Sequence, residues 1–565
     1  MNRSIVPAII LASVALAAFW YVVDSTRRDA SLLLVNGIVY TFDDAGTVAQ
    51  AVALRGSRIA AVGSSDDLRT RFAADTVIDL GGKTVIPGLI DGHGHILGEG
   101  GFLENLDLVG TTSPGQIAAL VRERAANSAG GQWIAGRGWD QNRWEDKEFP
   151  DHTLLDEAAP MNPVVLRRVD GHAIWVNAKA LEAAGLTAMT KDVEGGKIYR
   201  DGSGAPTGVL VDNAMALIDT VLPALSDANV EDRLRLALEE CARFGLTEVH
   251  DMGADLQTIA AYKRLIDRGE CPIRVYAAVG GAGPTWDFYR SHGPETGYGG
   301  DMLSVRALKL YIDGALGSRG AALVESYTDD PGNRGLTLMS EAELDTLCLQ
   351  ACAAGFQVCT HAIGDRGNHL VLDAYERALK PLGMNESRNR RWRIEHAQVL
   401  LPSDIPRFAA LAVLPSMQPT HATSDMPWAE SRLGAERIEG SYAWRSVLNT
   451  GTIIIGGSDF PVESVNPLWG IYAAMTRSDR TGYPEGGWRP GQKMTREEAV
   501  RCFTRWAAYG AFQESSKGTI APGKWADLTV LSKDIMQVPA AEILKTDCEM
   551  TIVGGKIIYR RDNSE

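Results

Sequence analysis

Side chains of the types that bind metal ions stand at the ends of several apolar runs in this sequence. With the segment that carries each one, they are His93 and His95 (IDGHGH), His361 (FQVCTH), His396 (WRIEH) and Asp459 (TIIIGGSD). The chain has only ten histidines among 565 residues, so this placement is informative. Imidazole and carboxylate groups are the nitrogen and oxygen ligands that zinc takes from proteins. The pattern predicts a metal site assembled from distant parts of the chain.

The spacing of His93 and His95 suits an extended strand. Residues two apart on a strand point to the same face, so both imidazoles can bind one ion. The runs before the other ligands have the character of buried parallel strands, with the ligands at their carboxyl ends. A single His-x-His pair is a weak signal, because a buried histidine is often a core residue. Four such strand ends in order are a strong one.

Eight segments in chain order have the character of strands in one parallel sheet. They are VIPGLIDGHGH, LTEVHDM, IRVYAAV, VRALKLYIDG, FQVCTHAIGD, WRIEHAQVL, LAVLPSMQ and TIIIGGSDF. Helical patterns separate most of them: residues 230–244 are amphipathic and end at Gly245, and Ser340-x-x-Glu343 and Thr495-x-x-Glu498 have the spacing of capping boxes. This alternation predicts an α/β fold with a (β/α)₈ TIM-type barrel over residues 87–514, whose carboxyl face would hold the chemistry.

Two further regions flank or interrupt the barrel. Residues 31–86 and 515–565 consist of short strands separated by glycine turns, and we expect them to form one small β-sandwich domain built from both ends of the chain. Residues 101–226 lie between the first and second barrel strands. This stretch is too long for a loop, so we expect an inserted subdomain over the barrel mouth.

The N-terminal segment, residues 1–30, is expected to be a signal peptide or a membrane anchor. Residues 5–23 are apolar apart from Ser13, and the run approaches the roughly 20 residues that span a bilayer. Ala15-Leu16-Ala17 makes only a mediocre cleavage site, which favours an uncleaved anchor. The catalytic domain would then be exported but held in the cell envelope, or periplasmic or secreted if the segment is cleaved.

Composition narrows the class of partner. The formal net charge is -15, which disfavours nucleic acid because phosphate binding needs a basic face. The seven cysteines lack the spacing of a disulfide scaffold. We expect a globular protein that acts on a small molecule, with contact to a membrane only through an uncleaved N-terminal segment, and a homodimer is left open.

Longer motifs add a family resemblance. They are VIPGLIDGHGH, GRGWDQNRW, DGHAIWVN, LKLYIDGALGSRGAAL, THAIGDRG, RIEHAQ, GGSDFPV and KGTIAPGKWADLTVL. In this order they resemble the amidohydrolase superfamily, in its YtcJ-like, amidohydrolase-3-type branch, from about residue 31 onwards. The resemblance implies a metal-dependent hydrolase of non-peptide C–N bonds in an amide, formamide or cyclic amide, in which a metal-activated hydroxide attacks. It implies no particular substrate, because the branch is functionally diverse.

The ligands divide between two expected ions. His93, His95 and Asp459 would hold the first, and His361 and His396 the second. Zn²⁺ is the first choice, one or two per chain, although Mn²⁺ or Fe²⁺ suits the same groups. Asp459 is also the candidate catalytic base, because a carboxylate beside the activated water can take its proton and deliver it to the leaving nitrogen.

Lys309, near the end of the fourth strand candidate, is the sixth expected metal ligand. An ammonium group among divalent ions would be strongly repelled. In related amidohydrolases the equivalent lysine reacts with CO₂ to give a carbamate that bridges two metals, and we adopt this as a hypothesis here. In the alternative, the ammonium reaches solvent or pairs with Asp313, and the site holds one metal.

Five residues are expected to contact substrate. Three lie in the insert and two in a glycine-rich loop after Lys309: His172, Trp139 and Asp140, then Asp313 and Arg319. His172 can hydrogen-bond substrate or a developing oxyanion, or it can brace the insert. A buried tryptophan such as Trp139 is by default a packing residue.

Two other functions are weighed against a two-metal hydrolase. One is a deaminase that uses a single metal. The other is a non-catalytic envelope binding protein on the same fold, since a fold does not dictate function. The ligand set argues against the second, because a binding protein has no need of four ligand-bearing strand ends.

Overall fold

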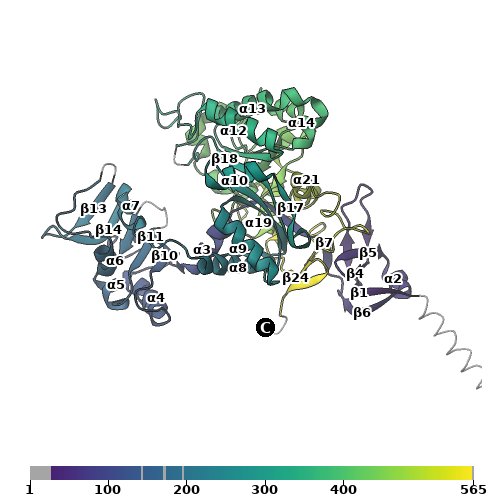
Figure 1. The fold of residues 1–565 in the computed structure, drawn as a ribbon, viewed down its shortest axis with the longest axis horizontal. Coiled ribbons are helices and arrows are strands. Elements are labelled where there is room, and N and C mark those ends of the chain that lie inside the picture. The colour runs from purple at the N-terminus through teal and green to yellow at the C-terminus, as the bar shows by residue number, and fades with distance from the viewer. Residues whose placement is uncertain (1–26, 142–143, 169–172, 194–195, 318, 563–565) are drawn as a thin grey trace, which may run out of the picture. The chain divides into compact units, whose positions relative to one another are not determined.

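The computed structural model describes residues 27–562, except 142–143, 169–172, 194–195 and 318 (Figure 1). The chain forms two compact units, Met1–Gly98 with Leu234–Glu565, and Glu99–Arg233, and each is described by itself. Residues 1–26 of the expected signal peptide or anchor lie outside the described residues, whereas strand β1 of the flanking domain begins at Arg28, three residues before the predicted boundary at residue 31. Within the described ranges, none of the helices has both the length and the apolar character needed to cross a bilayer.

The first unit contains a parallel sheet of eight strands that follow one another in chain order. They are β8 (Leu89–Gly94), β15 (Leu246–Ala254), β16 (Arg274–Gly280), β18 (Leu303–Tyr311), β19 (Gln357–Ala362), β20 (Arg393–His396), β21 (Leu414–Met417) and β22 (Ile455–Gly456). After β22 the chain returns to β8, where the backbone N–H of Asp459 donates to the carbonyl oxygen of His93 at 2.7 Å. The sheet is therefore a nearly closed barrel, and the predicted fold class is confirmed.

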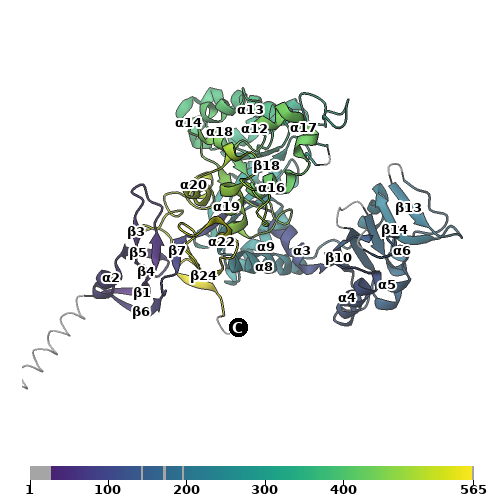
Figure 2. The ribbon, with the colours of Figure 1, turned by 180° about the vertical axis from the view of Figure 1, so that it is seen from behind.

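Helices follow the barrel strands along the chain (Figure 2). They are α8 (Asp227–Arg243) before β15, then α9 (Leu256–Asp267), α10 (Pro284–His292), α12 (Glu341–Ala354), α13 (Asp365–Leu379), α14 (Met384–Arg390), α15 (Ile405–Leu411), α16 (Pro419–Asp425), α17 (Ala429–Arg437), α18 (Trp444–Leu448), α19 (Pro467–Thr476), α20 (Arg496–Cys502) and α21 (Arg505–Gly510). Both predicted capping boxes are present, at the start of α12 and of α20. Helix α8 ends two residues before Gly245, whose φ is 90°.

The first strand candidate divides into two strands, which corrects the sequence prediction. Residues Thr84–Pro87 form β7 in a flanking sheet, and the barrel strand β8 begins at Leu89. Gly88 lies at the junction, where a Cβ atom would come within 2.2 Å of the Thr247 hydroxyl oxygen. Backbone and side chain are too close there for any residue but glycine.

Two sheets built from both ends of the chain form the flanking domain. One has the order β5-β4-β1-β6, and the other the order β25-β24-β23-β7-β2-β3. Their bounds are β1 (Arg28–Val35), β2 (Ile38–Tyr40), β3 (Val48–Ala49), β4 (Ala51–Arg55), β5 (Arg58–Gly63), β6 (Phe72–Asp79), β23 (Leu528–Leu531), β24 (Cys548–Val553) and β25 (Lys556–Arg560). Strand β23 pairs antiparallel with β7, and apolar residues of both sheets share one core. This is the predicted composite β-sandwich.

The second unit has its own sheet and core. Its strands have the order β13-β14-β12-β11-β10-β9. Its main elements are β9 (Leu106–Asp107), α4 (Pro114–Ala126), β10 (Ile134–Trp139), α5 (Thr153–Ala158), β11 (Val164–Arg168), β12 (Ala173–Val176), α6 (Ala178–Ala183), β13 (Gly196–Arg200) and β14 (Pro206–Asp212). Apolar clusters lie within the unit. That it covers the barrel mouth stays a prediction.

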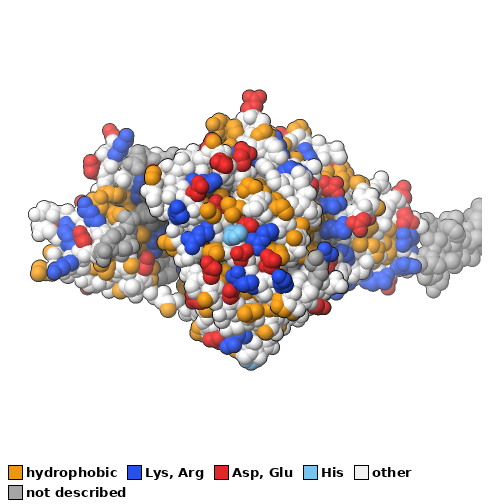
Figure 3. Space-filling model, turned by 90° about the horizontal axis from the view of Figure 1, so that it is seen from above, with side chains coloured by type: hydrophobic (Ala, Val, Ile, Leu, Met, Phe, Trp, Pro, Cys, Tyr) orange, Lys and Arg blue, Asp and Glu red, His pale blue; other side chains and the backbone are white. Residues whose placement is uncertain are grey.

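Short elements complete the described chain. They are α2 (Ser65–Arg71), α3 (Ile96–Glu104), η2 (Asn213–Met215), α7 (Ala216–Asp219), β17 (Glu295–Gly297), α11 (Tyr298–Asp301), η3 (Lys380–Leu382), η4 (Ile438–Gly440), η5 (Pro490–Gln492) and α22 (Ala540–Ile543). On the face shown in Figure 3, Lys and Arg side chains are interspersed with Asp and Glu side chains.

Candidate metal centre

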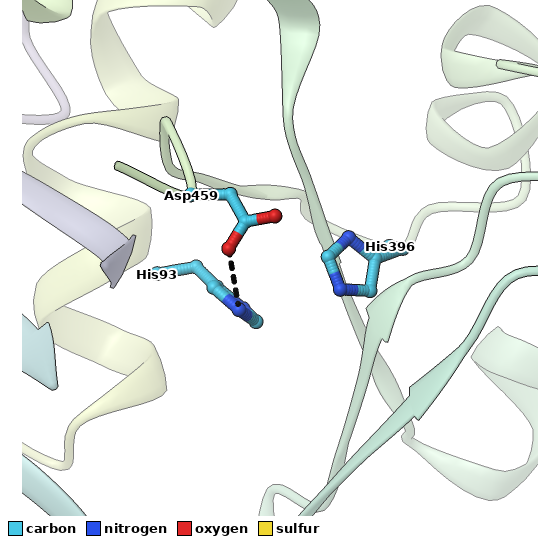
Figure 4. A group of neighbouring side chains, drawn as sticks. All are labelled: His93, His396 and Asp459. Carbon is cyan, nitrogen blue, oxygen red and sulfur yellow. Dashed lines mark ion pairs between the residues drawn. The ribbon is translucent and has the colours of Figure 1, made fainter. Parts of the chain in front are cut away.

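The carboxyl ends of the barrel strands bring the predicted metal ligands together. The ring centroids of His93 and His396 lie 4.9 Å apart, those of His361 and His396 4.4 Å, and those of His93 and His95 5.5 Å. Figure 4 shows the His93 ring and the Asp459 carboxylate beside each other, with the His396 ring across from them. Residues more than 300 positions apart in the chain thus meet because parallel strands end at one face of the barrel.

The spacing of the ligand atoms suits a small cation. Asp459 Oδ1 lies 3.1 Å from His95 Nε2 and 3.4 Å from His93 Nε2. Zinc bonds of 2.0–2.1 Å in a tetrahedron place neighbouring ligand atoms about 3.3 Å apart. One ligand atom each from His93, His396 and Asp459 also lies within 4.8 Å of the others. These side chains are therefore already at the separations that a shared ion requires.

The backbone at two ligand positions has an unusual conformation. His396 has φ 71° and Asp459 has φ 64°, in the left-handed region that residues other than glycine seldom adopt. The chain before Asp459 packs closely against the first barrel strand: a Cβ atom on Gly457 would lie 2.5 Å from the backbone nitrogen of His93. Strain of this kind is often found at functional sites, where the surrounding structure holds it in place.

Buried imidazole nitrogens at the centre are free to bind a cation. Among the described residues, His361 Nε2 and His396 Nδ1 are buried and have no hydrogen-bond partner. Burial and the nearby charge of Lys309 lower the pKa of His93 to about 4 and that of His361 to about 3. Burial also holds the pKa of His396 well below its usual value. Neutral imidazoles with unused lone pairs are suited to be metal ligands, and leaving them unpaired is costly.

A cavity of about 410 Å³ adjoins these ligands. Its lining comprises His95, Lys309, Tyr311, Ala315, Leu316, Gly317, His361, Ile363, His396, Gln398, His421, Ser424, Asp425, Trp428, Asp459, Val462 and Glu463. This volume is within the range of small-molecule sites. A larger hollow, about 920 Å³, lies among other residues and contains none of the predicted ligands. We therefore assign substrate binding to the smaller cavity, where the reactive groups are.

His421 is a site residue that the sequence prediction missed. Its Nε2 lies 3.6 Å from Asp459 Oδ2, and its ring is nearly parallel to that of His396 with centroids 5.8 Å apart. It belongs to α16, directly after the seventh barrel strand. Its position three residues beyond the strand candidate LAVLPSMQ was the available signal.

Comparison with known proteins agrees with this geometry. A model described as "Amidohydrolase family" matches residues 76–559, and one described as "Imidazolonepropionase-like composite domain, bacteria" matches residues 51–74. The chain belongs to the amidohydrolase family. It is accordingly a metal-dependent hydrolase that acts on C–N bonds other than peptide bonds.

Relatives of this amidohydrolase extend over nearly its whole length. It is 33% identical over 535 residues to the putative amidohydrolase YtcJ of Bacillus subtilis (strain 168), covering 93% of this chain and 99% of YtcJ. It is 28% identical over 556 residues to an N-substituted formamide deformylase of Arthrobacter pascens, covering 94% and 99%. A solved structure of an uncharacterized metal-dependent hydrolase from Pyrococcus horikoshii OT3 matches with a TM-score of 0.75 and 26% identity, covering 90% and 99%.

Glu395 holds the ring of the candidate ligand His93 in place. His93 Nδ1 lies 2.6 Å from Glu395 Oε2, and both side chains are fully buried. Burial alone would raise the pKa of Glu395, but Arg393 and His93 more than offset it, so that the pKa lies below its usual range. The carboxylate therefore favours the tautomer with its proton on Nδ1, which leaves the Nε2 lone pair for a metal. Glu395 adjoins His396 in the chain, but the sequence alone did not indicate this role.

A buried polar network continues from Glu395 through the barrel interior. Arg393 Nε lies 2.8 Å from Glu395 Oε1, and Arg393 Nη1 lies 2.9 Å from His250 Nδ1. His250 Nε2 is 3.5 Å from Glu248, which pairs with Lys517. All of these side chains are buried. His250 is thus a core histidine, and the network links the metal centre to the C-terminal segment.

Lys309 lies at the metal centre rather than in solvent. It is fully buried, and its Nζ lies 3.3 Å from His93 Nε2. Burial lowers its pKa, although the charges of Glu395 and Asp459 oppose this effect. The alternative in which its ammonium reaches solvent does not describe this amidohydrolase.

Asp313 and Arg319 both make contacts that organise their loop. The Asp313 carboxylate is 1% exposed and accepts hydrogen bonds from the backbone N–H groups of Ala322, Ile363 and Gly364 at 2.8–3.0 Å. Burial raises its pKa to about 7 against the effect of these donors. Arg319 binds Asp329 through Nε and Nη2 at 3.2 and 3.0 Å. Both side chains thus help to organise the loop, and their contact with substrate stays a prediction.

The predicted substrate residues of the insert have different surroundings. Trp139 is fully buried, and its Nε1 donates to the carbonyl oxygen of Leu166 at 2.8 Å. This burial favours the packing alternative, and contact of Trp139 with substrate stays a prediction. Asp140 pairs with Arg168 at 2.7 Å. His172 lies outside the described residues, so its role stays a prediction.

Proposed function

We propose that this amidohydrolase cleaves the C–N bond of an amide, formamide or cyclic amide in a small molecule, with zinc as its metal. The observation that carries the proposal is the convergence of His93, His396 and Asp459 within 4.8 Å, beside a cavity of about 410 Å³. The relative named as an N-substituted formamide deformylase favours formamides within this class.

The donor set suits one or two divalent ions. His93, His95 and Asp459 would hold the first, and His361 and His396 the second, with Mn²⁺ or Fe²⁺ as alternatives to zinc. A bound ion of this kind supplies an activated water molecule and a polarised carbonyl group. The unpartnered nitrogens of His361 and His396 support the assignment, because a cation satisfies lone pairs that the described residues leave unused.

Asp459 would act as the base that moves the proton. Burial alone would raise its pKa, but the hydrogen bond from His95 and the neighbouring imidazoles more than offset this, so the pKa lies well below its usual range. The carboxylate is therefore ionised at neutral pH and can accept a proton from the attacking water. It would then deliver this proton to the leaving nitrogen as the C–N bond breaks, and a carboxylic acid and an amine are released.

Carbamylation of Lys309 belongs to the same proposal. Burial favours its neutral amine, whose nitrogen lone pair is the nucleophile that reaction with CO₂ requires. The amine nitrogen forms an N–C bond to CO₂ and loses one proton, which leaves to bulk water through the cavity that Lys309 lines, so a neutral amine is replaced by a negatively charged carbamate next to His93. Native mass spectrometry should show one added CO₂ in the metal-loaded protein and none in Lys309→Met. One metal per chain with no adduct would instead support the single-metal deaminase.

The activity test compares metal states of one preparation. Protein stripped with a chelator should not hydrolyse N-substituted formamides, amides or cyclic amides, and zinc should restore release of formate or another acid together with the amine. His93→Asn should not respond to zinc, whereas His292→Asn, an exposed histidine on α10, should respond like the parent protein. A zinc-loaded, folded protein that cleaves none of the three classes would refute the proposal.

We propose a location in the cell envelope on the character of residues 1–30. A membrane anchor leaves the full chain in the membrane fraction, whereas a cleaved signal leaves a shortened, soluble chain. Cell fractionation with intact-mass measurement separates the two, and a full-length chain in the cytoplasmic fraction would contradict both.

A further inference from the structure

The cavity wall beyond the metal ligands is acidic at one side. Two carboxylates line it, Asp425 at the end of α16 and Glu463 after β22. Lys309 is the one Lys or Arg side chain among the described lining residues, and it lies at the metal centre against His93. The part of a ligand that extends past the metal centre into this cavity therefore faces the two carboxylates.

Neutral donors hold Asp425 in place. Its Oδ2 accepts hydrogen bonds from the Tyr442 hydroxyl at 2.7 Å and from Gln398 Nε2 at 3.1 Å. Tyr442 and Gln398 are both buried. These donors fix the carboxylate in position without cancelling its charge, because neither carries a positive charge.

Glu463 also has a neutral partner. Its Oε1 accepts a hydrogen bond from the Ser424 hydroxyl at 2.6 Å. Two arginines, Arg319 and Arg432, follow the lining residues Gly317 and Trp428 closely in the chain, and both bind Asp329. Neither arginine is a lining residue, so the charges of the acidic wall are available to a ligand.

Apolar groups form most of the remaining wall. Trp428 lies against Gly317, where a Cβ atom would come within 3.3 Å of the indole ring. Val462 is 69% exposed although it is apolar. Aromatic faces attract cations as well as apolar groups. His396, which lines the same cavity and is 5% exposed, has an unpartnered Nδ1, which marks this space as a ligand site.

We propose that this amidohydrolase prefers substrates with an apolar body that ends in a positively charged amine, and that it rejects those that end in a carboxylate. The inference rests on the proposed function, because it describes the substrate of that site. An amine facing Asp425 and Glu463 is attracted by both, whereas a carboxylate is repelled by both, and the one Lys or Arg among the described lining residues, Lys309, lies against His93 at the metal centre. Selectivity of this kind excludes N-acyl amino acids as preferred substrates.

The test uses three N-benzylformamides that differ only in the para substituent of the benzyl ring. These are aminomethyl, which is cationic, ethyl, which is neutral, and carboxymethyl, which is anionic. With zinc-loaded full-length protein at low salt, kcat/KM should be about fivefold or more higher for the cationic than for the neutral compound, and lower still for the anionic one. Added salt should reduce the differences, because ions screen partly exposed charges.

Variants test whether the acidic wall is the cause. Glu463→Gln and Asp425→Asn should each lower the ratio of cationic to neutral kcat/KM severalfold. The matched control is Glu430→Gln, an exposed glutamate on α17 that does not line the cavity, and it should keep the parent ratio. If one wall variant fails to fold, the other variant and the salt dependence still show whether the acidic wall causes the selectivity.

Two different failures can be told apart. Equal rates for the cationic and anionic compounds, or an unchanged ratio in both wall variants, would overturn the inference and leave the proposed function intact. If none of the three compounds is hydrolysed, the proposed formamide activity fails. Calorimetry then measures the binding of the amines that hydrolysis of these compounds would release. Tighter binding of the diamine from the aminomethyl compound than of the amino acid from the carboxymethyl compound supports the inference, and the reverse overturns it.

Discussion

Asp459 has contacts that suit both a metal ligand and a proton carrier. Its two oxygens face different partners, Oδ1 toward His95 and His93 and Oδ2 toward His421. One oxygen can therefore bind a cation while the other stays near the cavity. Its ionised state depends on these imidazoles, since burial by itself would favour the protonated form.

The substitution Asp459→Asn separates the two roles. The amide keeps an oxygen that can bind a metal, but it cannot accept the proton, so we expect substantial zinc retention with kcat reduced by roughly 100-fold or more. Metal analysis and steady-state kinetics on the same sample check this. Retention of full activity would show that another group is the base.

The contact with His93 predicts that Glu395 is a positioning residue, which affects a bound metal through that imidazole. In Glu395→Gln the hydrogen bond to His93 Nδ1 is weakened and Arg393 loses its charged partner. We expect zinc affinity to fall by roughly 10–100-fold, with kcat partly restored at saturating zinc. Competition with a chelator measures the affinity, and Glu430→Gln is the control. Unchanged affinity would mean that Glu395 has only a structural role.

At the scale of elements, a residue that caps the start of helix α20 also binds a second helix. Glu498 closes the capping box of α20 with Thr495, and its carboxylate also binds Arg445 of α18, with Arg445 Nη1 to Glu498 Oε1 at 2.9 Å. The hydrogen bond from Arg445 outweighs burial and lowers the pKa of Glu498 from 4.5 to about 2. The capping box, which the sequence alone predicts, therefore also takes part in a contact between two helices.

This contact predicts a pH dependence of stability. Because the folded pKa lies below the unfolded value, the contribution of Glu498 is fully present above pH 4.5 and is lost as the pH falls toward 2. Glu498→Gln should lower the free energy of unfolding by about 1 kcal/mol at pH 7, allowing for solvent screening, and by less near pH 3. Urea unfolding at both pH values measures the difference. A difference that does not shrink at low pH would contradict this account.

At the scale of the whole molecule, the C-terminal segment is part of the catalytic unit. Strands β23 to β25 share one sheet with β7, β2 and β3, and Arg274 of the barrel binds Asp527 at 2.7 Å. Lys517 also reaches the barrel interior, where it pairs with Glu248. The barrel and the composite domain are therefore expected to unfold together.

Replacing Lys517 tests this coupling. Lys517→Met leaves the Glu248 carboxylate buried beside His250 without its cation, so we expect a loss of about 3 kcal/mol in unfolding free energy. The double variant Lys517→Met with Glu248→Gln should recover part of the loss, since it leaves no unpaired charge. Chemical denaturation of the three proteins checks this. A double variant no more stable than the single one would show that the buried charge is not the cause.

Sequence reasoning was sufficient for the order of the barrel strands, the composite sandwich and the meeting of the candidate ligands where the strands end. These features have local signals: apolar runs of strand length, capping residues, and ligands placed where strands end. It was also sufficient for the capping boxes at Ser340 and Thr495, because a cap depends on residues only three positions apart.

Other features depend on which side chains meet across the barrel, and only the tertiary structure decided them. The chain alone did not indicate that Glu395 binds His93, that His421 adjoins Asp459, or that Asp313 is enclosed by backbone N–H groups. Nor did it show that Gly88 divides two strands, since that follows from contact with Thr247. The sequence by itself determines which residue types meet at the candidate metal centre. Their hydrogen-bond partners and charge states result from burial and from contacts between residues far apart in the chain.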